Sequence, residues 1–182
     1  MPRPLLVLDL DETLWCGVPD STAPGGLRLL LRPHLREFLE GVSAHYDLAV
    51  WTAASEDWMR EGLTQLHAHT SYDLASAAVF LWHRGHCTVR REEDGSYSFR
   101  KPARKFKVGW IREHYPRDRI LAVDDQPANY ASGYGHLVRV SEWMGDPEDD
   151  ELLKLAAYLV SIVGEPDLRR LEKRGWRGRV ES

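Results

Sequence analysis

The sequence predicts an α/β fold with a central parallel sheet flanked by helices. Apolar runs of strand length alternate with longer segments whose apolar residues recur at helical spacing, which is typical of parallel sheets. Three of the runs, within 4–9, 46–52 and 119–125, end in carboxyl or hydroxyl groups, as buried strands that lead into a site do. The chain has 182 residues, of which 43% are hydrophobic and 29% charged, so we expect a single domain over 1–182.

The first half of the chain begins with a strand over 4–9. A loop that contains glycine and proline is expected over 16–26, and the apolar piece 27–31 is expected to form a flap. A helix is expected over 33–44, because proline suits the first helical position and the apolar residues after it recur at helical spacing. The strand 46–52 follows directly and completes a strand-helix-strand unit.

The second half repeats this pattern. The segment 55–67 has the apolar spacing of a helix, and 75–82 is expected to be a strand. The segment 88–99 alternates around an Asp-Gly pair, which is a strong hairpin signal. A helix over 104–114 and a strand over 119–123 come next.

Two segments complete the expected fold. The segment 149–163 has a wide apolar face and is expected to pack on the sheet, whereas 166–176 is expected to be helical but peripheral. Little chain separates the first strand from the flap, and the other insertion holds little more than the hairpin. We therefore expect a small β-hairpin insert and no large cap domain.

Polar groups of complementary kinds follow the expected strands. Asp9 and Asp11 come after the first strand, Thr52 ends the second, and Asp124-Asp125 ends a later one. Ligands of open α/β sheets bind beyond the carboxyl ends of the strands, so these groups are expected to lie together, with Lys101 completing the set. One carboxylate can attack while another moves protons or helps to hold a cation. Taken singly, each has a plainer interpretation: a turn for the first acids, a helix cap for the threonine and an exposed charge for the lysine.

The order of these groups resembles the haloacid dehalogenase superfamily of phosphohydrolases. Asp9–Leu14 and Trp51–Ala53 are similar to the phosphatases that act on the carboxy-terminal domain of RNA polymerase II. The branch of that family that carries a ubiquitin-like domain is similar over further segments. These are Leu31–Pro33, Lys101-Pro102, Asp124-Asp125, 151–155 and 174–176. The resemblance extends from Leu5 to about Trp176, so we expect neither a ubiquitin-like domain nor an appended phosphopeptide-reading module.

The resemblance implies a Rossmann-like domain and a set of catalytic roles. Asp9 would be the nucleophile and form an aspartyl-phosphate. Asp11 would protonate the leaving oxygen and then take a proton from the water that hydrolyses the intermediate. Thr13 would hold the loop, and Thr52 with the backbone amide of Ala53 would cradle the phosphate.

The resemblance also implies a magnesium ion. A carboxylate that attacks an anion is repelled at close range, so a cation that bridges nucleophile and phosphate is needed. Mg²⁺ prefers oxygen ligands, and these would be Asp9, the carbonyl of Asp11 and Asp125. Asp124 would orient Lys101, whose charge would act on the phosphate and the nucleophile.

An open cleft favours a phosphate displayed on a macromolecule, and the resemblance implies phosphoserine or phosphothreonine of a protein or peptide. The alternative is a terminal phosphate of DNA or RNA, because 100–107 carries five cations and Arg84, Arg90 and Arg91 lie nearby. These cations could equally be a solvated helix start and hairpin face. A binding module without turnover is a third possibility, and the presence of the acids and the lysine argues against it.

Cysteines and histidines give weaker signals. Two cysteines provide no disulfide framework, which suits a reducing compartment, and Cys16 is expected to be buried or in the flap. His83, His86 and Cys87 could seed a zinc site, but no second ligand pair is evident, so a strand-to-hairpin transition is the plainer interpretation.

The remaining signals concern tryptophans and location. Trp51, Trp58 and Trp110 have core-like positions, whereas Trp15 and Trp82 are better placed for a pocket. No run approaches the roughly 20 apolar residues that span a bilayer, and the N-terminus lacks the pattern of a signal peptide. We expect a soluble intracellular protein with no membrane partner. It would be cytoplasmic if the source is bacterial, and the nucleus is a possible location if the source is eukaryotic. The sequence leaves the oligomeric state open.

Overall fold

The computed structural model describes residues 2–23 and 26–180 and confirms the predicted α/β fold. Five parallel strands form the central sheet in the order β5-β4-β1-β8-β9. Their bounds are Leu5–Leu8 for β1, Asp47–Trp51 for β4, Leu81–Trp82 for β5, Ile120–Asp124 for β8 and Leu137–Arg139 for β9. The chain builds from β1 to β5 on one side and then adds β8 and β9 on the other, so the strand order reverses beside β1. Ligands of such sheets bind at this reversal, beyond the carboxyl ends of the strands.

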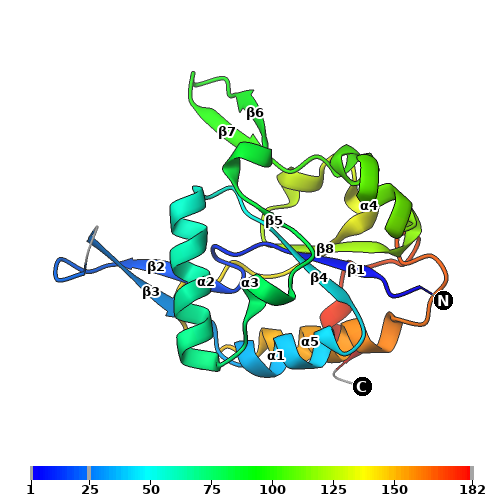
Figure 1. Ribbon diagram of the computed structural model, residues 1–182, viewed down its shortest axis with the longest axis horizontal. Helices are drawn as coiled ribbons and strands as arrows, with labels where there is room; N and C mark the ends of the chain where they lie inside the picture. The colour runs from blue at the N-terminus through cyan, green and yellow to red at the C-terminus, as the bar shows by residue number, and fades with distance from the viewer. Residues whose placement is uncertain (1, 24–25, 181–182) are drawn as a thin grey trace.

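Strand side chains alternate between the two faces of the sheet. We call one the aliphatic face, because it presents Leu6, Leu8, Leu48, Val50, Leu121 and Val123. Three helices contribute buried residues to it: α1 (Leu35–Ser43), α2 (Glu56–Thr70) and α5 (Glu151–Ile162). Figure 1 shows α1 and α5 side by side below the sheet.

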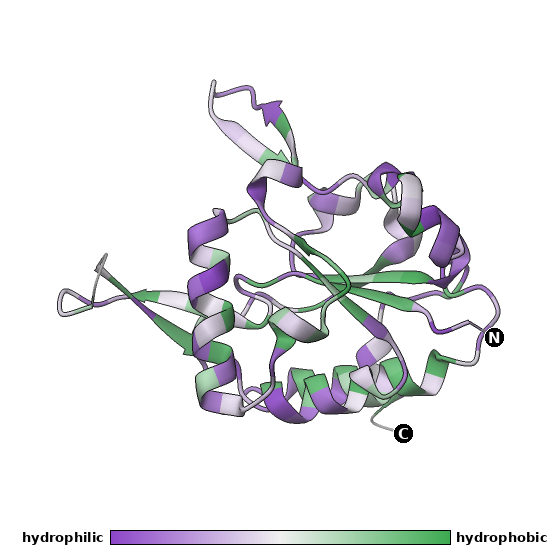
Figure 2. Ribbon diagram, in the orientation of Figure 1, coloured by the Kyte–Doolittle hydropathy of each residue, from purple (hydrophilic) through white to green (hydrophobic). Residues whose placement is uncertain are grey.

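The opposite face, which we call the aromatic face, presents Leu5, Val7, Ala49, Trp51, Ile120 and Ala122. Short helical segments contribute the buried residues that cover it: η3 (Ala103–Lys107), α4 (Gly109–His114) and η5 (Pro127–Tyr130). Both faces of every central strand are therefore buried, as a parallel sheet requires. In Figure 2 hydrophobic residues are concentrated in the central strands, whereas hydrophilic residues are prominent along α2 and around α4.

The helices of the aliphatic face form where the sequence predicts them. The apolar residues of α1 recur at helical spacing and are all buried: Leu35, Phe38, Leu39 and Val42. The helix begins two residues later than predicted, because His34 has a left-handed backbone (φ 61°) and lies outside it. The hydroxyl of Ser55 caps α2 by accepting a hydrogen bond from the Trp58 amide at 3.3 Å. This helix continues to Thr70, three residues beyond the predicted end.

Two antiparallel hairpins project from the body in Figure 1. The first pairs β2 (Trp15–Pro19) with β3 (Leu27–Leu31), so the prediction of a loop from residue 16 was wrong for its first residues. The second pairs β6 (Thr88–Arg91) with β7 (Tyr97–Arg100) around Asp94 and Gly95, which confirms the predicted hairpin. Within residues 2–23 and 26–180, neither insertion is large enough to be a cap domain.

Two further predictions were wrong, and one strand was not predicted. The segment 75–82 holds the helix α3 (Leu74–Ala77), which the Asp73 side chain caps, and only its end forms β5. The predicted helix 104–114 is broken at Val108, whose extended backbone separates η3 from α4. The strand β9 was not predicted, because its three residues carry too short an apolar signal.

The C-terminal segment is neither helical over 166–176 nor peripheral. Leu168 and Trp176 are fully buried in the core of the aliphatic face, and the indole Nε1 of Trp176 donates to the Arg139 carbonyl at 2.8 Å. The remaining 3-10 segments are η2 (Arg84–His86), η4 (Arg117–Arg119), η6 (Tyr134–His136) and η7 (Trp176–Arg179). None of the helices in the described ranges is both long enough and apolar enough to cross a membrane.

Candidate active site

Three carboxylates meet at the carboxyl edge of the sheet. Asp9 directly follows β1, Asp124 ends β8, and Asp125 follows it. All three are buried, and their ligand oxygens lie within 4.8 Å of one another. The adjacency of β1 and β8 brings them together, because Leu8 pairs with Val123 and the Asp9 amide donates to the Val123 carbonyl at 3.0 Å.

Lys101 is the cation at the centre of this cluster. Its Nζ donates to Oδ1 of Asp9, and to Oδ2 of Asp124 at 2.8 Å, and the side chain is buried. Burial alone would lower the pKa of Lys101, but Asp124 and Asp9 outweigh it and raise that pKa above its usual range. The prediction that Asp124 lies beside Lys101 agrees with this geometry.

The acids carry more charge than Lys101 neutralises. Burial raises the pKa of the Asp9 carboxyl well above its ordinary value, with Lys101 opposing and Asp124 and Asp125 adding to the rise. Burial and the neighbouring Asp124 also raise the pKa of Asp125. When all three acids are ionised and Lys101 is protonated, the net charge is −2. Oxygen donors in a buried cluster with this charge fit a hard divalent cation such as Mg²⁺.

Amide groups hold the acid pair in place. The side chain of Asn129 donates to both oxygens of Asp124, at 3.0 and 3.1 Å, and the Gln126 amide donates to Oδ1 at 2.8 Å. The side-chain amide of Gln126 donates to Oδ2 of Asp125 at 2.7 Å. Sequence reasoning missed Gln126 and Asn129, although both closely follow the acid pair along the chain. Burial and Asp124 raise the pKa of Asp125, and the hydrogen bond from Gln126 opposes this rise.

Thr13 and Thr52 lie where the sequence predicts, next to the acids. The hydroxyl of Thr13 lies 3.4 Å from both Oδ2 of Asp9 and Oδ1 of Asp125, so it bridges the ends of β1 and β8. The hydroxyl of Thr52 accepts from the Ala54 amide at 3.0 Å and donates to Asp11 at 3.3 Å. Thr13 therefore joins two acids of the cluster, and Thr52 contacts the neighbouring Asp11.

Two tryptophans bind Asp11, and both have environments that differ from those predicted from the sequence. The indole Nε1 atoms of Trp15 and Trp58 donate to Oδ1 of Asp11 at 3.1 and 2.6 Å. Trp15 is fully buried rather than a pocket residue, and Trp58 is half-buried rather than in the core. Of the other expected core positions, Trp51 is buried but Trp110 is 41% exposed.

A cavity of about 190 Å³ opens over this cluster. Its lining comprises Asp9, Asp11, Glu12, Thr52, Ala53, Phe99, Arg100, Lys101, Asp125, Gln126 and Asn129. The first hairpin's preceding loop and the second hairpin's last strand both contribute to it. Burial raises the pKa of Glu12 to about 7, and the nearby Asp11, Asp125 and Glu142 add to the rise. The lining combines strong cations and carboxylates around a space suited to a small charged group.

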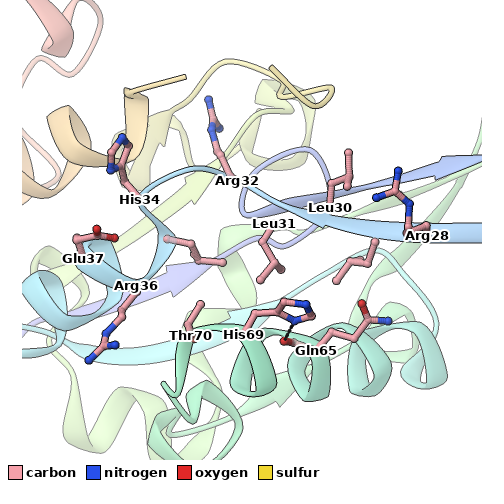
Figure 3. A pocket seen from close by; sticks show the side chains of 12 residues that line it. Arg28, Leu30, Leu31, Arg32, His34, Arg36, Glu37, Gln65, His69 and Thr70 are labelled. Atoms are coloured by element: carbon pink, nitrogen blue, oxygen red, sulfur yellow. Dashed lines mark hydrogen bonds between the residues drawn. The ribbon is translucent and has the colours of Figure 1, made fainter. Parts of the chain in front are cut away.

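A larger cavity, of about 560 Å³, lies elsewhere between β3, α1 and α2 (Figure 3). Leucines of β3 and basic groups such as Arg28 and Arg36 line it, and Figure 3 shows Leu31 directed toward α2. None of the residues predicted to be catalytic, phosphate-binding or metal-binding contributes to this lining. The acid cluster at the smaller cavity is therefore the candidate active site.

The weaker metal hypothesis is not supported. Among the residues that the structure describes, the only group of three potential ligands close enough for a metal is Asp9, Asp124 and Asp125. His83 accepts from the Gly85 amide at 3.2 Å, and His86 stacks on Trp82 with ring centroids 5.6 Å apart. These contacts agree with the plainer interpretation, a strand-to-hairpin transition.

The basic run separates into different environments. Lys101 is buried in the site, Arg100 pairs with Glu92 at 2.7 Å, and Arg104 and Lys107 are exposed. The two cysteines are free, and Cys16 is buried, as predicted.

The α/β fold of this chain has a match among solved structures. It matches the fission yeast RNA polymerase II CTD phosphatase Fcp1 with a TM-score of 0.54 and 16% identity, over 94% of this chain and 54% of that chain. Residues 4–169 match the family model of the NLI interacting factor-like phosphatases, and the chain belongs to this family. The predicted resemblance is thereby confirmed.

Curated relatives agree with this assignment. The chain is 29% identical over 180 residues to the ubiquitin-like domain-containing CTD phosphatase of Arabidopsis thaliana, covering 96% of this chain and 51% of the relative. It is 31% identical over 186 residues to ubiquitin-like domain-containing CTD phosphatase 1 of Xenopus tropicalis, covering 96% of this chain and 54% of the relative. The chain thus spans about half the length of these relatives.

Proposed function

We propose that this chain is a single catalytic domain that hydrolyses phosphomonoesters through an aspartyl-phosphate on Asp9, with Mg²⁺ as cofactor. The observation that carries the proposal is the buried contact between Asp9 and Lys101 at the floor of a small charged cavity, beside Asp125. Asp9, Asp125 and the backbone carbonyl of Asp11 would hold the Mg²⁺ ion. When bound, this ion would neutralise charge between the nucleophile and the phosphate.

The reaction has two steps. In the first, a carboxylate oxygen of Asp9 attacks phosphorus, the bond to the ester oxygen breaks, and Asp11 gives its proton to that oxygen. In the second, water attacks the same phosphorus, the bond to Asp9 breaks, and Asp11 takes a proton from the water. Lys101 neutralises charge on the phosphoryl oxygens, and Thr52 with the amide of Ala53 binds them.

The substrate class we propose is phosphoserine or phosphothreonine of a protein inside the cell. Two relatives are named as CTD phosphatases, and within residues 2–23 and 26–180 the hairpins leave the cavity without a domain that would enclose a small metabolite. The alternative substrate is a terminal phosphate of DNA or RNA, favoured by the exposed Arg90, Arg91 and Arg104 near the second hairpin. A non-catalytic phosphate-binding module is the remaining possibility.

Phosphate release tests the proposal. A panel would contain a phosphoserine peptide, oligonucleotides phosphorylated at the 5′ or 3′ end, and a sugar phosphate, each with Mg²⁺ and with excess chelator. We expect release from the peptide that requires Mg²⁺, and a loss of at least about a thousandfold in Asp9→Asn.

Asp150→Asn, which changes an exposed carboxylate just before α5, is the matched control and should keep full activity. Full activity of Asp9→Asn would refute the aspartyl-phosphate mechanism. A preference for oligonucleotide ends would mean that the same reaction acts on nucleic acids. If no substrate released phosphate, a non-catalytic phosphate-binding module would be the remaining function.

A further inference from the structure

The proton-transfer residue of the proposed mechanism is bound by two indole groups. Trp15 begins β2 and Trp58 lies in α2, yet both direct Nε1 at the same oxygen, Oδ1 of Asp11. The other oxygen, Oδ2, has a different partner, the hydroxyl of Thr52 at 3.3 Å. The two oxygens of Asp11 therefore lie in different environments.

Packing between β2 and α2 holds each indole ring. Trp15 is fully buried in the core of the aliphatic face. It lies so close to α2 that a Cβ on Gly62 would come within 2.4 Å of its ring. Trp58 lies in turn against β2, where a Cβ on Gly17 would be 3.3 Å from its ring. Each ring thus packs where the facing element has a glycine, and the buried Trp15 is enclosed on all sides.

The two donors occupy Oδ1 fully. A carboxylate oxygen has two lone pairs, and each indole supplies one N–H that can only donate. A proton on Oδ1 would point at one of these donors, so the proton that Asp11 carries belongs on Oδ2. This oxygen neighbours Thr52, which lines the cavity together with Asp9.

We propose that Trp15 and Trp58 are positioning residues that fix Asp11 through Oδ1 and leave Oδ2 as the oxygen that exchanges the proton. This inference rests on the proposed function. Oδ2 gives its proton to the ester oxygen as that oxygen leaves phosphorus, and later receives a proton from the attacking water. Neither indole contacts the substrate phosphate in this scheme.

The first test compares leaving groups in Trp15→Phe and Trp58→Phe, which keep an aromatic ring but remove the N–H. A phosphoserine alkoxide needs a proton to leave, whereas a p-nitrophenolate does not. We expect kcat for a phosphoserine peptide to fall by roughly 10- to 100-fold, because a displaced general acid loses much of its effect. The burst of p-nitrophenolate from p-nitrophenyl phosphate, which reports formation of the phosphoenzyme, should stay within about threefold of the wild type.

Controls separate positioning from damage to the fold. KM of Trp15→Phe should be unchanged, because this side chain is fully buried and cannot touch the substrate. Trp110→Phe, at an exposed tryptophan whose ring meets that of Phe80 edge to face, should behave as the wild type. If Trp15→Phe does not fold, the half-buried Trp58 still provides the test. Equal losses with both leaving groups would overturn the proposal, since a general structural defect gives that result.

A double-mutant cycle with Asp11→Asn completes the test. If the indoles act through Asp11, adding Trp58→Phe to Asp11→Asn should cost less than about twofold, because the carboxylate is already absent. Additive losses would refute the inference. An inactive wild type would instead reject the proposed function, whereas an active wild type with an inactive Asp9→Asn and unaffected tryptophan variants would reject only the positioning role.

Discussion

The two faces of the sheet support the site in different ways. On the aliphatic face, long helices and leucine-rich strands form the core that includes Trp15, one of the two donors to Asp11. On the aromatic face, short helical segments surround Trp51, whose ring lies 5.7 Å from that of Phe106. Lys101 comes two residues before the first of these segments, η3. Asp11, the proposed proton-transfer group, thus contacts a residue of the aliphatic core, whereas Lys101 precedes the short segments of the aromatic face.

The largest effect should come from removing the cation. Lys101→Met is expected to lower kcat by roughly 10²- to 10³-fold, because the buried acids and the phosphoryl oxygens would lose their fixed positive charge. Steady-state phosphate release at saturating Mg²⁺ measures the loss. Lys107→Met, which changes an exposed lysine at the end of the following η3 segment, should stay within about twofold of the wild type. If Lys101→Met kept a tenth of the activity, the positive charge of Lys101 would not be the main contribution of the aromatic face to the site.

The next effect concerns the free energy of unfolding, which should depend on pH through His136. This side chain packs beside Phe106 with ring centroids 5.3 Å apart. Its Nδ1 donates to the Ile120 carbonyl at 2.8 Å, since a carbonyl only accepts, and the buried Nε2 has no hydrogen-bond partner in the described part of the chain. Burial lowers the pKa of His136 to about 4 from its ordinary 6.5.

Stability should fall as the pH is lowered, because the unfolded chain binds more protons at His136 than the folded chain does. Below pH 6.5 the unfolded chain binds a proton at His136, whereas the folded chain does not bind it until the pH nears 4. The contribution of His136 to the free energy of unfolding is therefore fully present above pH 6.5 and is lost as the pH falls toward 4. The shift corresponds to at most about 3 kcal/mol of unfolding free energy. Urea titrations of wild type and His136→Gln between pH 7 and pH 4 should show a flatter dependence in the variant. Parallel curves would mean that His136 is protonated in the folded state.

A smaller effect should distinguish the faces through matched phenylalanines. Phe38 in α1 and Phe106 in η3 are both buried, one on each face. Replacing either with leucine should lower the free energy of unfolding by on the order of 1–2 kcal/mol. Phe106→Leu should also lower kcat severalfold, because Phe106 fixes the segment that follows Lys101, whereas Phe38→Leu should not. Equal kcat values in the two variants would remove the functional contrast between the faces.

The sequence predicts the elements that carry a strong periodic signal. The runs that became β1, β4 and β8 are apolar on both faces, and α1 and α5 show their buried stripes directly. Two strands escape this logic. β9 has three residues and forms by pairing with β8, and β2 forms by pairing with β3. Such pairings depend on distant partners and leave little local trace in the sequence.

The candidate site also has a part that the sequence predicts and a part that it does not. The rule that ligands bind beyond the carboxyl ends of parallel strands places Asp9, Asp124 and Asp125 at one edge of the sheet, where the structure has them. The amides of Gln126 and Asn129 and the indole of Trp58 follow no such rule, because their direction depends on how a loop closes and how α2 is rotated about its axis. Roles set by side-chain direction become evident only in three dimensions.

The close approach of Gly62 to Trp15 also has an evolutionary meaning. Any side chain at position 62 would displace the ring at position 15, since even a single carbon would lie 2.4 Å from it. Neither residue can therefore drift independently of the other. Among related sequences, a larger residue at position 62 should occur together with a smaller residue at position 15, and such sequences would lose one of the two indole donors to Asp11.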